Sequence, residues 1–168
     1  MLLRMFLSRV GAIRGAYKQG DKKAMVFETK IRVRYSETDK MGVVYHANYL
    51  MYFEVARTEL LHELGYPYEE VEKKGYLSPV VDVHLHYGAS LQFGDVAVVR
   101  TRITKLTQTK TVFEYAIYKE GQDFETERPC VTGETTLGLV DGASFKPASM
   151  KRAIPELYEM YQRALEEG

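Results

Sequence analysis

Asp39 and His46 are the residues of this sequence whose types and positions best suit chemistry. They lie seven residues apart in segment 36–47, which lacks regular periodicity and precedes a helical pattern that starts at Asn48. A carboxylate can attack a carbonyl carbon or activate water, and the first N–H groups of a helix can stabilise an oxyanion. A loop aspartate also commonly binds its own backbone in a turn, and residue type alone favours that structural interpretation of Asp39.

Two further groups of polar residues suit chemistry less well. Glu37 stands two residues before Asp39 and could pair with it, although adjacent acids in a loop are more often solvated. Asp82, His84 and His86 alternate along one face of a strand pattern, and His-x-His could bind a metal. No cysteine joins them, so we expect a polar strand face or a subunit contact and no metal site.

The remaining candidates favour structural roles. Glu54 and Arg57 are three residues apart on the expected helix, where they could form a buried ion pair. Cys130 is the single cysteine and is expected to be a small apolar side chain in a strand. One cysteine excludes an intramolecular disulfide and a cysteine-rich zinc site, and it suits a reducing compartment such as the cytoplasm. No apolar run approaches the roughly 20 residues of a membrane span.

The elements that must position these residues follow from periodicity and from turn signals. The expected strands are residues 29–35, 80–87, 95–106, 111–119 and 129–140, and the expected helices are 48–64, 67–74 and 155–165. In the first strand Ile31, Val33 and Tyr35 share one face. One early helix followed by successive strands predicts an α+β domain with one sheet packed on the helix.

The expected helix of residues 48–64 is apolar around much of its circumference, and Asn48 is expected to cap its start. Gly65 follows its end, which is typical of a helix C-terminus. Its main stripe contains Tyr49, Phe53, Ala56, Leu60 and Leu64, and Leu50, Val55 and Leu61 widen it. We therefore expect the helix to be well buried.

The charge of the chain is divided between two regions. The 168 residues include 23 basic and 23 acidic ones, but residues 1–24 carry six basic residues against Asp21 alone, a balance of +5. The remainder, with 17 basic and 22 acidic residues, has a balance of −5. The leader could be a targeting or membrane-surface segment, or an appendage upstream of a start at Met25; three arginines make it a poor secretory signal. We expect residues 25–168 to form one domain that does not bind nucleic acid, because this body is acidic.

Segment 34–57, RYSETDKMGVVYHANYLMYFEVAR, resembles the signature of the hotdog-fold 4-hydroxybenzoyl-CoA thioesterase family, and especially the acyl-CoA thioesterases associated with the Tol–Pal system. The likeness extends more weakly over residues 27–140. The matching residues are Tyr35, Thr38-Asp39, Gly42-Val43-Val44-Tyr45-His46, Asn48-Tyr49, Phe53-Glu54 and Ala56-Arg57.

The resemblance implies a fold, a reaction and roles for residues. The fold would be a curved antiparallel sheet wrapped around one long central helix, and the reaction would be hydrolysis of acyl-CoA without metal or cofactor. Asp39 would be the nucleophile or the general base, and the His46 backbone N–H would polarise the thioester carbonyl; the His46 imidazole either orients the substrate or only packs. Gly42, Val43 and Tyr45 would shape the oxyanion site. The active cleft would lie between the subunits of a homodimer or homotetramer.

A coenzyme A ester carries phosphates, so the acidic body must supply local positive charge. Arg100, Arg102 and Lys105 lie in or just after one expected strand, and we expect them to form this patch. Two other classes of function stay open: a hotdog dehydratase acting on acyl chains, and a non-catalytic module that binds acyl thioesters or regulates.

Overall fold

The computed structural model describes residues 24–166. The expected basic leader therefore lies outside the described residues, except for Ala24. In chain order the elements are β1 (Phe27–Arg32), a 3-10 turn (Tyr35–Glu37), α2 (Asn48–Glu63), α3 (Tyr68–Lys73), β2 (Tyr76–Leu77), β3 (Val80–Tyr87), β4 (Val96–Leu106), β5 (Lys110–Lys119), β6 (Val131–Gly138), β7 (Val140–Asp141), α4 (Met150–Ala153) and α5 (Pro155–Glu166). None of the helices in this described part is long and apolar enough to cross a bilayer.

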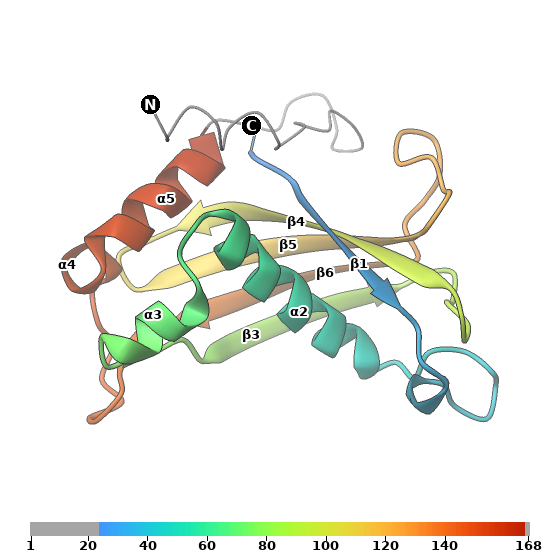
Figure 1. Ribbon diagram of the computed structural model, residues 1–168, viewed down its shortest axis with the longest axis horizontal. Helices are drawn as coiled ribbons and strands as arrows, with labels where there is room; N and C mark the ends of the chain where they lie inside the picture. The colour runs from blue at the N-terminus through green and yellow to red at the C-terminus, as the bar shows by residue number, and fades with distance from the viewer. Residues whose placement is uncertain (1–23, 167–168) are drawn as a thin grey trace.

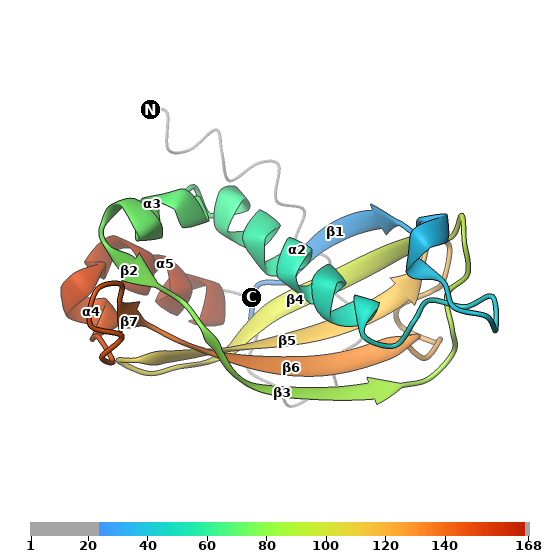
Figure 2. The same ribbon diagram turned by 90° about the horizontal axis from the view of Figure 1, so that it is seen from below.

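One curved antiparallel sheet and one long helix form the body of the molecule (Figure 1). The strand order is β1-β4-β5-β6-β3, and β2 pairs with β7 in a separate two-stranded sheet. Figure 2 shows α2 lying across one face of the larger sheet, with α3 and α5 at one end of it. The predicted α+β class and hotdog-type arrangement are confirmed.

Aromatic stacking joins α2 to the middle of the sheet. The Phe53 ring lies 4.1 Å from the Tyr115 ring, nearly parallel to it, and both side chains are fully buried. Gly133 of β6 is the cross-strand partner of Tyr115, and a Cβ at Gly133 would stand 2.4 Å from Phe53 Cε2. A residue without a side chain is therefore required where the Phe53 ring packs on the sheet.

We expect Gly133→Ala to lower the free energy of unfolding by about 1–3 kcal/mol, the usual cost of overpacking a core. Phe53 cannot move aside easily, because its ring is stacked on Tyr115. Denaturant unfolding monitored by circular dichroism measures the change. Gly138→Ala on the same strand is the matched control, since its new Cβ would meet Val81 Cγ1 at 3.6 Å, an ordinary contact. Equal stability of the two variants would contradict this account of the core.

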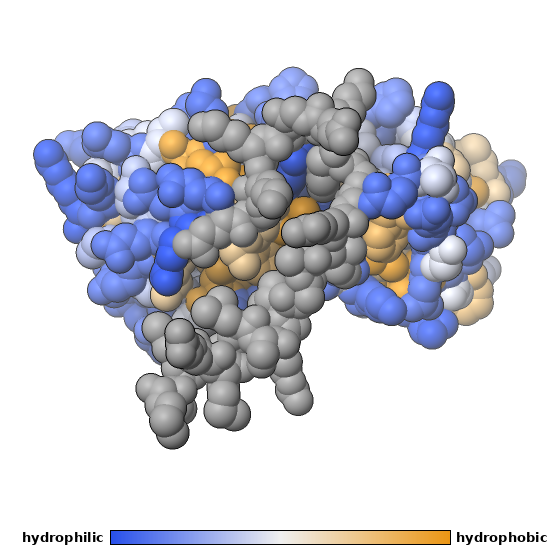
Figure 3. Space-filling model, turned by 90° about the horizontal axis from the view of Figure 1, so that it is seen from above, coloured by the Kyte–Doolittle hydropathy of each residue, from blue (hydrophilic) through white to orange (hydrophobic). Residues whose placement is uncertain are grey.

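The outer surface differs between regions of the molecule. On the side seen in Figure 3, hydrophilic side chains cover most of the surface, and hydrophobic ones appear as separate patches between them. At the edge of the sheet, β3 is exposed along both faces, with only Leu85 partly buried. The outer edge of β3 has no neighbouring strand in the described residues.

The first strand ends earlier than its alternation predicts. β1 stops at Arg32, and Tyr35, which was expected to share a buried face with Ile31 and Val33, is 77% exposed in the 3-10 turn. The chain turns because the Glu37 carboxylate accepts hydrogen bonds from the backbone N–H and the guanidinium of Arg34. This local interaction overrides the strand pattern.

Two expectations for α2 are also wrong. Asn48 does not cap the helix: Ala47 occupies the N-cap position, and the Asn48 side chain instead donates to the Glu37 carbonyl at 2.8 Å. Leu50 and Val55 are exposed, whereas Leu61 is buried. The sheet covers one side of the helix only, so apolar residues on the other side remain at the surface.

Candidate active site

Glu37 fixes the loop that precedes α2. Its Oε2 accepts hydrogen bonds from the Arg34 backbone N–H and the Tyr52 hydroxyl, each at 2.8 Å, and its Oε1 accepts from the Arg34 guanidinium at 2.7 and 2.9 Å. The residue is only 8% exposed. Its carbonyl accepts from the Tyr45 N–H at 2.9 Å and from the Asn48 side chain. Glu37 therefore ties the outgoing chain, the returning chain and the helix together.

Ionisation follows from this arrangement. Burial alone would raise the pKa of the Glu37 carboxyl, but hydrogen bonds from the Arg34 backbone, Tyr52 and the Arg34 side chain lower it overall. Burial, followed by the hydrogen bond to the Glu37 carboxylate, raises the pKa of Tyr52. Glu37 is thus held as an anion and Tyr52 as a neutral donor.

Asp39 lies in a tight turn within this loop. Its N–H donates to the Val43 carbonyl and its carbonyl accepts from the Gly42 N–H, both at 2.9 Å. Its Oδ1 accepts from the Met41 N–H at 2.8 Å, which leaves Oδ2 without a hydrogen-bond partner among the described residues. Gly42 has φ 76°, a left-handed conformation that favours glycine. The turn interpretation and the catalytic interpretation of Asp39 are therefore compatible, because Oδ1 binds the turn and Oδ2 remains available.

The partly buried Asp39 carboxylate lines a pocket of about 150 Å³. The pocket is bounded by the loop, by the start of α2 and by residues 87–90, which are the last residue of β3 and the three that follow it. Lining residues from these segments include Asp39, Met41, Val43, His46, Tyr49 and Tyr87. The structure thus brings Asp39 and His46 to one cavity, together with the 87–90 segment, for which the sequence contains no recognisable signal.

His46, the residue before the N-cap of α2, has a backbone N–H without an acceptor among the described residues. The Asn48 N–H, by contrast, donates to the Tyr45 carbonyl. The Tyr87 hydroxyl donates to the His46 carbonyl at 3.2 Å, and the His46 ring lies 4.2 Å from the Tyr45 ring. The partial positive charge of a helix N-terminus strengthens donors at this position. Because His46 lines the same pocket as Asp39, its N–H is a candidate donor to an anion bound there.

The three expected positioning residues do different things. Gly42 makes the turn, and Val43 lines the pocket and pairs with Gln92. The Tyr45 N–H is already bound to the Glu37 carbonyl, so it is not available to an oxyanion. Its exposed ring flanks His46.

The structure does not bring Arg100, Arg102 and Lys105 to this pocket. Arg100 is 0% exposed, with its Nε 3.0 Å from Glu28 Oε1. Arg102 is buried and bound to Glu114 at 2.6 Å, while Lys105 is exposed. The prediction of a coenzyme-binding patch gains no support from this geometry.

The other polar candidates lie elsewhere. Asp82 and His84 form an exposed pair at 3.0 Å on β3, and the described residues contain no cluster of three metal-ligating side chains. Arg57 and Glu54 approach within 3.9 Å, but the Glu54 side chain is exposed, so the pair is not buried as expected. Cys130 is buried as an apolar filler would be.

A second pocket of about 190 Å³ lies along the other half of α2. Arg57, Leu61, Thr111, Phe113 and Tyr161 are among its lining residues. It is the larger cavity but shares no lining residue with the Asp39 pocket. Size alone would therefore select a pocket that contains neither Asp39 nor His46.

Comparisons with known proteins identify the family of the chain. The sequence profile of the thioesterase-like superfamily matches residues 33–161. A protein of Bacillus subtilis (strain 168) described as "putative acyl-CoA thioesterase YneP" is 42% identical over 139 residues, covering 83% of this chain and 97% of that protein. The acyl-CoA thioester hydrolase YbgC of Escherichia coli O6:H1 is 29% identical over 129 residues, 77% of this chain and 92% of its own length.

A solved structure shows the same likeness in three dimensions. The crystal structure of a DHNA-CoA thioesterase from Staphylococcus aureus superposes with a TM-score of 0.77 at 36% identity, covering 82% of this chain and 89% of that one. The matched residues of the sequence profile include both Asp39 and α2. The chain therefore belongs to the thioesterase-like superfamily.

Proposed function

We propose that the protein hydrolyses acyl-CoA thioesters to the free acid and coenzyme A. One observation carries the proposal: the Asp39 carboxylate, with one oxygen free, shares a pocket with His46, whose N–H at the start of α2 has no acceptor among the described residues. The names of the relatives YneP and YbgC support the substrate class.

The reaction requires little beyond these groups. The thioester carbonyl oxygen accepts a hydrogen bond from the His46 N–H, which stabilises the negative charge that grows there. Asp39 Oδ2 either attacks the carbonyl carbon or removes a proton from an attacking water. The carbon–sulfur bond then breaks, and the thiolate leaves without a strong acid because thiols have a pKa of about 8.5. Single-turnover hydrolysis in isotopically labelled water distinguishes the two routes, since hydrolysis of an acyl–Asp39 anhydride at the Asp39 carbonyl places label in the protein.

A panel of substrates tests the function. Short aliphatic, long aliphatic and aromatic acyl-CoA esters are assayed by thiol release, with an acyl carrier protein ester added. We expect hydrolysis of at least one CoA ester by the full chain. Saturable binding of acyl-CoA without turnover would instead support the non-catalytic module.

The proposal includes a homodimer or homotetramer with the active cleft at the subunit interface. The free edge of β3 carries exposed apolar residues, and α2 exposes Leu50, Met51 and Val55. If two copies of β3 pair antiparallel about His84, apolar residues face apolar ones and an acid faces a histidine. The opposed pairs are then Val81 with Tyr87, Asp82 with His86 and Val83 with Leu85.

We expect Val83→Asp to convert the oligomer to monomer and to lower kcat/KM at least about 10-fold, because each new carboxylate would lie opposite an apolar Leu85 and burying an unpaired charge is costly. Size-exclusion chromatography with light scattering and a thioesterase assay measure both effects. Phe145→Asp, an equal change at another exposed apolar residue, is the control. A fully active monomer would refute the interface site.

The proposal also places the enzyme in the cytoplasm. A reducing compartment suits a chain whose single thiol is buried. Burial raises the pKa of Cys130, which keeps the thiol protonated and unreactive.

A further inference from the structure

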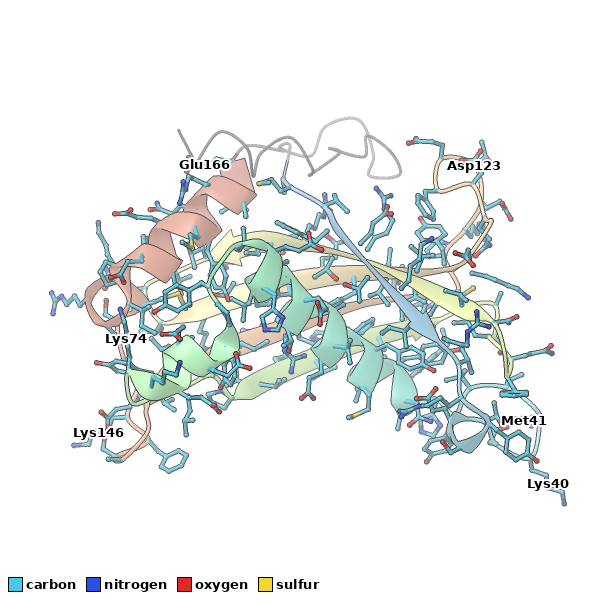
Figure 4. The ribbon with its side chains drawn as sticks, in the orientation of Figure 1. Lys40, Met41, Lys74, Asp123, Lys146 and Glu166 are labelled. Carbon is cyan, nitrogen blue, oxygen red and sulfur yellow. The ribbon has the colours of Figure 1, made fainter. Side chains whose placement is uncertain are left out.

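Two large aromatic side chains stand exposed beside the catalytic loop. Tyr35 is 77% exposed and Phe93 is 62% exposed, and their rings lie 5.6 Å apart at 90°. Met41, at the outer end of the loop, is 78% exposed (Figure 4). Contiguous exposed apolar groups of this kind mark binding surfaces. We call Tyr35 and Phe93 the aromatic pair.

The chain holds the aromatic pair close to Asp39. Asp39 is the fourth residue after Tyr35, so their Cα atoms lie within about 14 Å of each other. The Thr38 hydroxyl donates to the Tyr35 carbonyl at 2.8 Å, which shortens this path. Phe93 follows Gln92, which pairs with Val43 of the same loop. Both rings are therefore fixed to the loop that carries the catalytic carboxylate.

Basic side chains surround the aromatic pair. Arg32 Nη1 donates to the carbonyl of Gly94, the residue after Phe93, at 3.3 Å. The Arg34 side chain is largely exposed even though it binds Glu37, and Lys40 projects at the tip of the loop (Figure 4). Two of the nearby acids are paired with bases, since Glu37 binds Arg34 and Asp95 binds Lys119 at 2.7 Å, whereas Asp39 has no basic partner among the described residues. The surface beside the pocket thus offers flat rings with cations around them.

The pocket of a single chain is small for a coenzyme A ester. Its volume of about 150 Å³ compares with about 300–1,000 Å³ for the sites of drug-sized ligands. The pantetheine arm would therefore lead out of this pocket, and the nucleotide would lie outside it. Residues 25–168 have a net charge of −5, so a polyanion needs a local cluster of cations.

We propose that the aromatic pair binds the adenine ring of acyl-CoA, and that Arg32, Arg34 and Lys40 bind its phosphates. The inference rests on the proposed function and deepens it. Aromatic side chains stack on any base because every base has a π face, and guanidinium groups match phosphate oxygens in pairs. Arg100 and Arg102 are buried, and each lies against an acid, Glu28 and Glu114 respectively.

Two substrates with the same acyl group test the proposal: the acyl-CoA and the acyl-pantetheine, which lacks the nucleotide. For the double variant Tyr35→Ala/Phe93→Ala we expect KM for acyl-CoA to rise about 10-fold or more, with kcat nearly unchanged. KM for acyl-pantetheine should not change. Arg32→Gln should also raise KM for acyl-CoA without changing KM for acyl-pantetheine. It should weaken the dependence of KM for acyl-CoA on salt concentration. Phe145→Ala, at another exposed phenylalanine, is the control and should alter neither KM.

Each other outcome overturns the proposal in a recognisable way. Equal changes with both substrates would show that the aromatic pair supports the loop and not the nucleotide. A smaller oligomer of the double variant in size-exclusion chromatography, with both activities lost, would assign the surface to a second copy of the chain. If KM of the double variant is unchanged for both substrates, the aromatic pair does not bind the nucleotide. If the wild-type protein hydrolyses neither ester, it is the proposed function that fails.

Discussion

Asp39→Asn is expected to lower kcat about 10²–10⁴-fold, the usual contribution of a catalytic acid or base, while KM changes little. The asparagine amide oxygen can still accept the hydrogen bond that Asp39 Oδ1 receives from the Met41 N–H. The turn therefore persists, and the variant loses only the negative oxygen that faces the pocket. Because that oxygen acts in the transition state, kcat and kcat/KM should fall together. Steady-state thioester hydrolysis measures the effect, and circular dichroism verifies the fold.

Asp123→Asn is the matched control for this prediction. Asp123 also binds its own loop, because its Oδ1 accepts from the Glu125 N–H at 2.9 Å, but it does not line the Asp39 pocket. This control should keep full activity. Near-full activity of folded Asp39→Asn would remove Asp39 from the mechanism.

Glu37→Gln is expected to affect both stability and catalysis. The change removes the anion to which Tyr52 and Arg34 are bound, so we expect the free energy of unfolding at neutral pH to fall by about 1–3 kcal/mol. The loop that carries Asp39 would lose its anchor, and a displacement of about 1 Å at reacting groups can cost up to about 10²-fold in rate. We expect kcat to fall while KM stays nearly constant, which identifies Glu37 as a positioning residue.

The pH dependence of stability distinguishes this role. The pKa of Glu37 in the folded protein lies below the ordinary value of 4.5. The carboxylate therefore stabilises the fold above pH 4.5, and this contribution disappears as the pH falls through the folded pKa. The stability difference between wild type and Glu37→Gln should shrink over that range in urea titrations.

Glu120→Gln, in an exposed pair with Lys30 at 2.8 Å, is the control and should change stability by less than about 1 kcal/mol. Tyr52→Phe keeps the Glu37 charge and removes one hydrogen bond to it. The free energy of unfolding of this variant should therefore lie between those of wild type and Glu37→Gln. If Glu37→Gln lowers stability and leaves kcat unchanged, Glu37 stabilises the fold and does not position the reacting groups.

Local sequence patterns predicted the fold and, within the candidate site, the proximity of Asp39 and His46. Asp39 and His46 share a pocket because a short loop joins them directly to α2, and short connections can be recognised in sequence. The strands β3 to β6 were likewise visible as alternating runs bounded by turns. What the sequence could predict was the geometry set by neighbours along the chain.

Contacts between distant segments were not predictable. Glu37 looks like a solvated loop acid until Tyr52, fifteen residues later, reaches its carboxylate; only the Arg34–Glu37 spacing gave a local signal. Arg100 and Arg102 looked like surface charges, yet sheet pairing buries them beside Glu28 and Glu114. Residues 87–90 reach the pocket because β3 pairs with β6, a register that no short motif encodes.

The two sides of the Asp39 pocket differ in how freely they can vary. On one side Tyr49 is buried in α2, so a substitution there disturbs the core. On the other side residues 88–90 are exposed, and this segment is attached to the core by few bonds, such as that from the Gly88 N–H to the Cys130 carbonyl at 2.8 Å. Substitutions at residues 88–90 can therefore reshape one wall of the pocket without disturbing the core, whereas a substitution at Tyr49 would alter the pocket and lower the stability of the fold together.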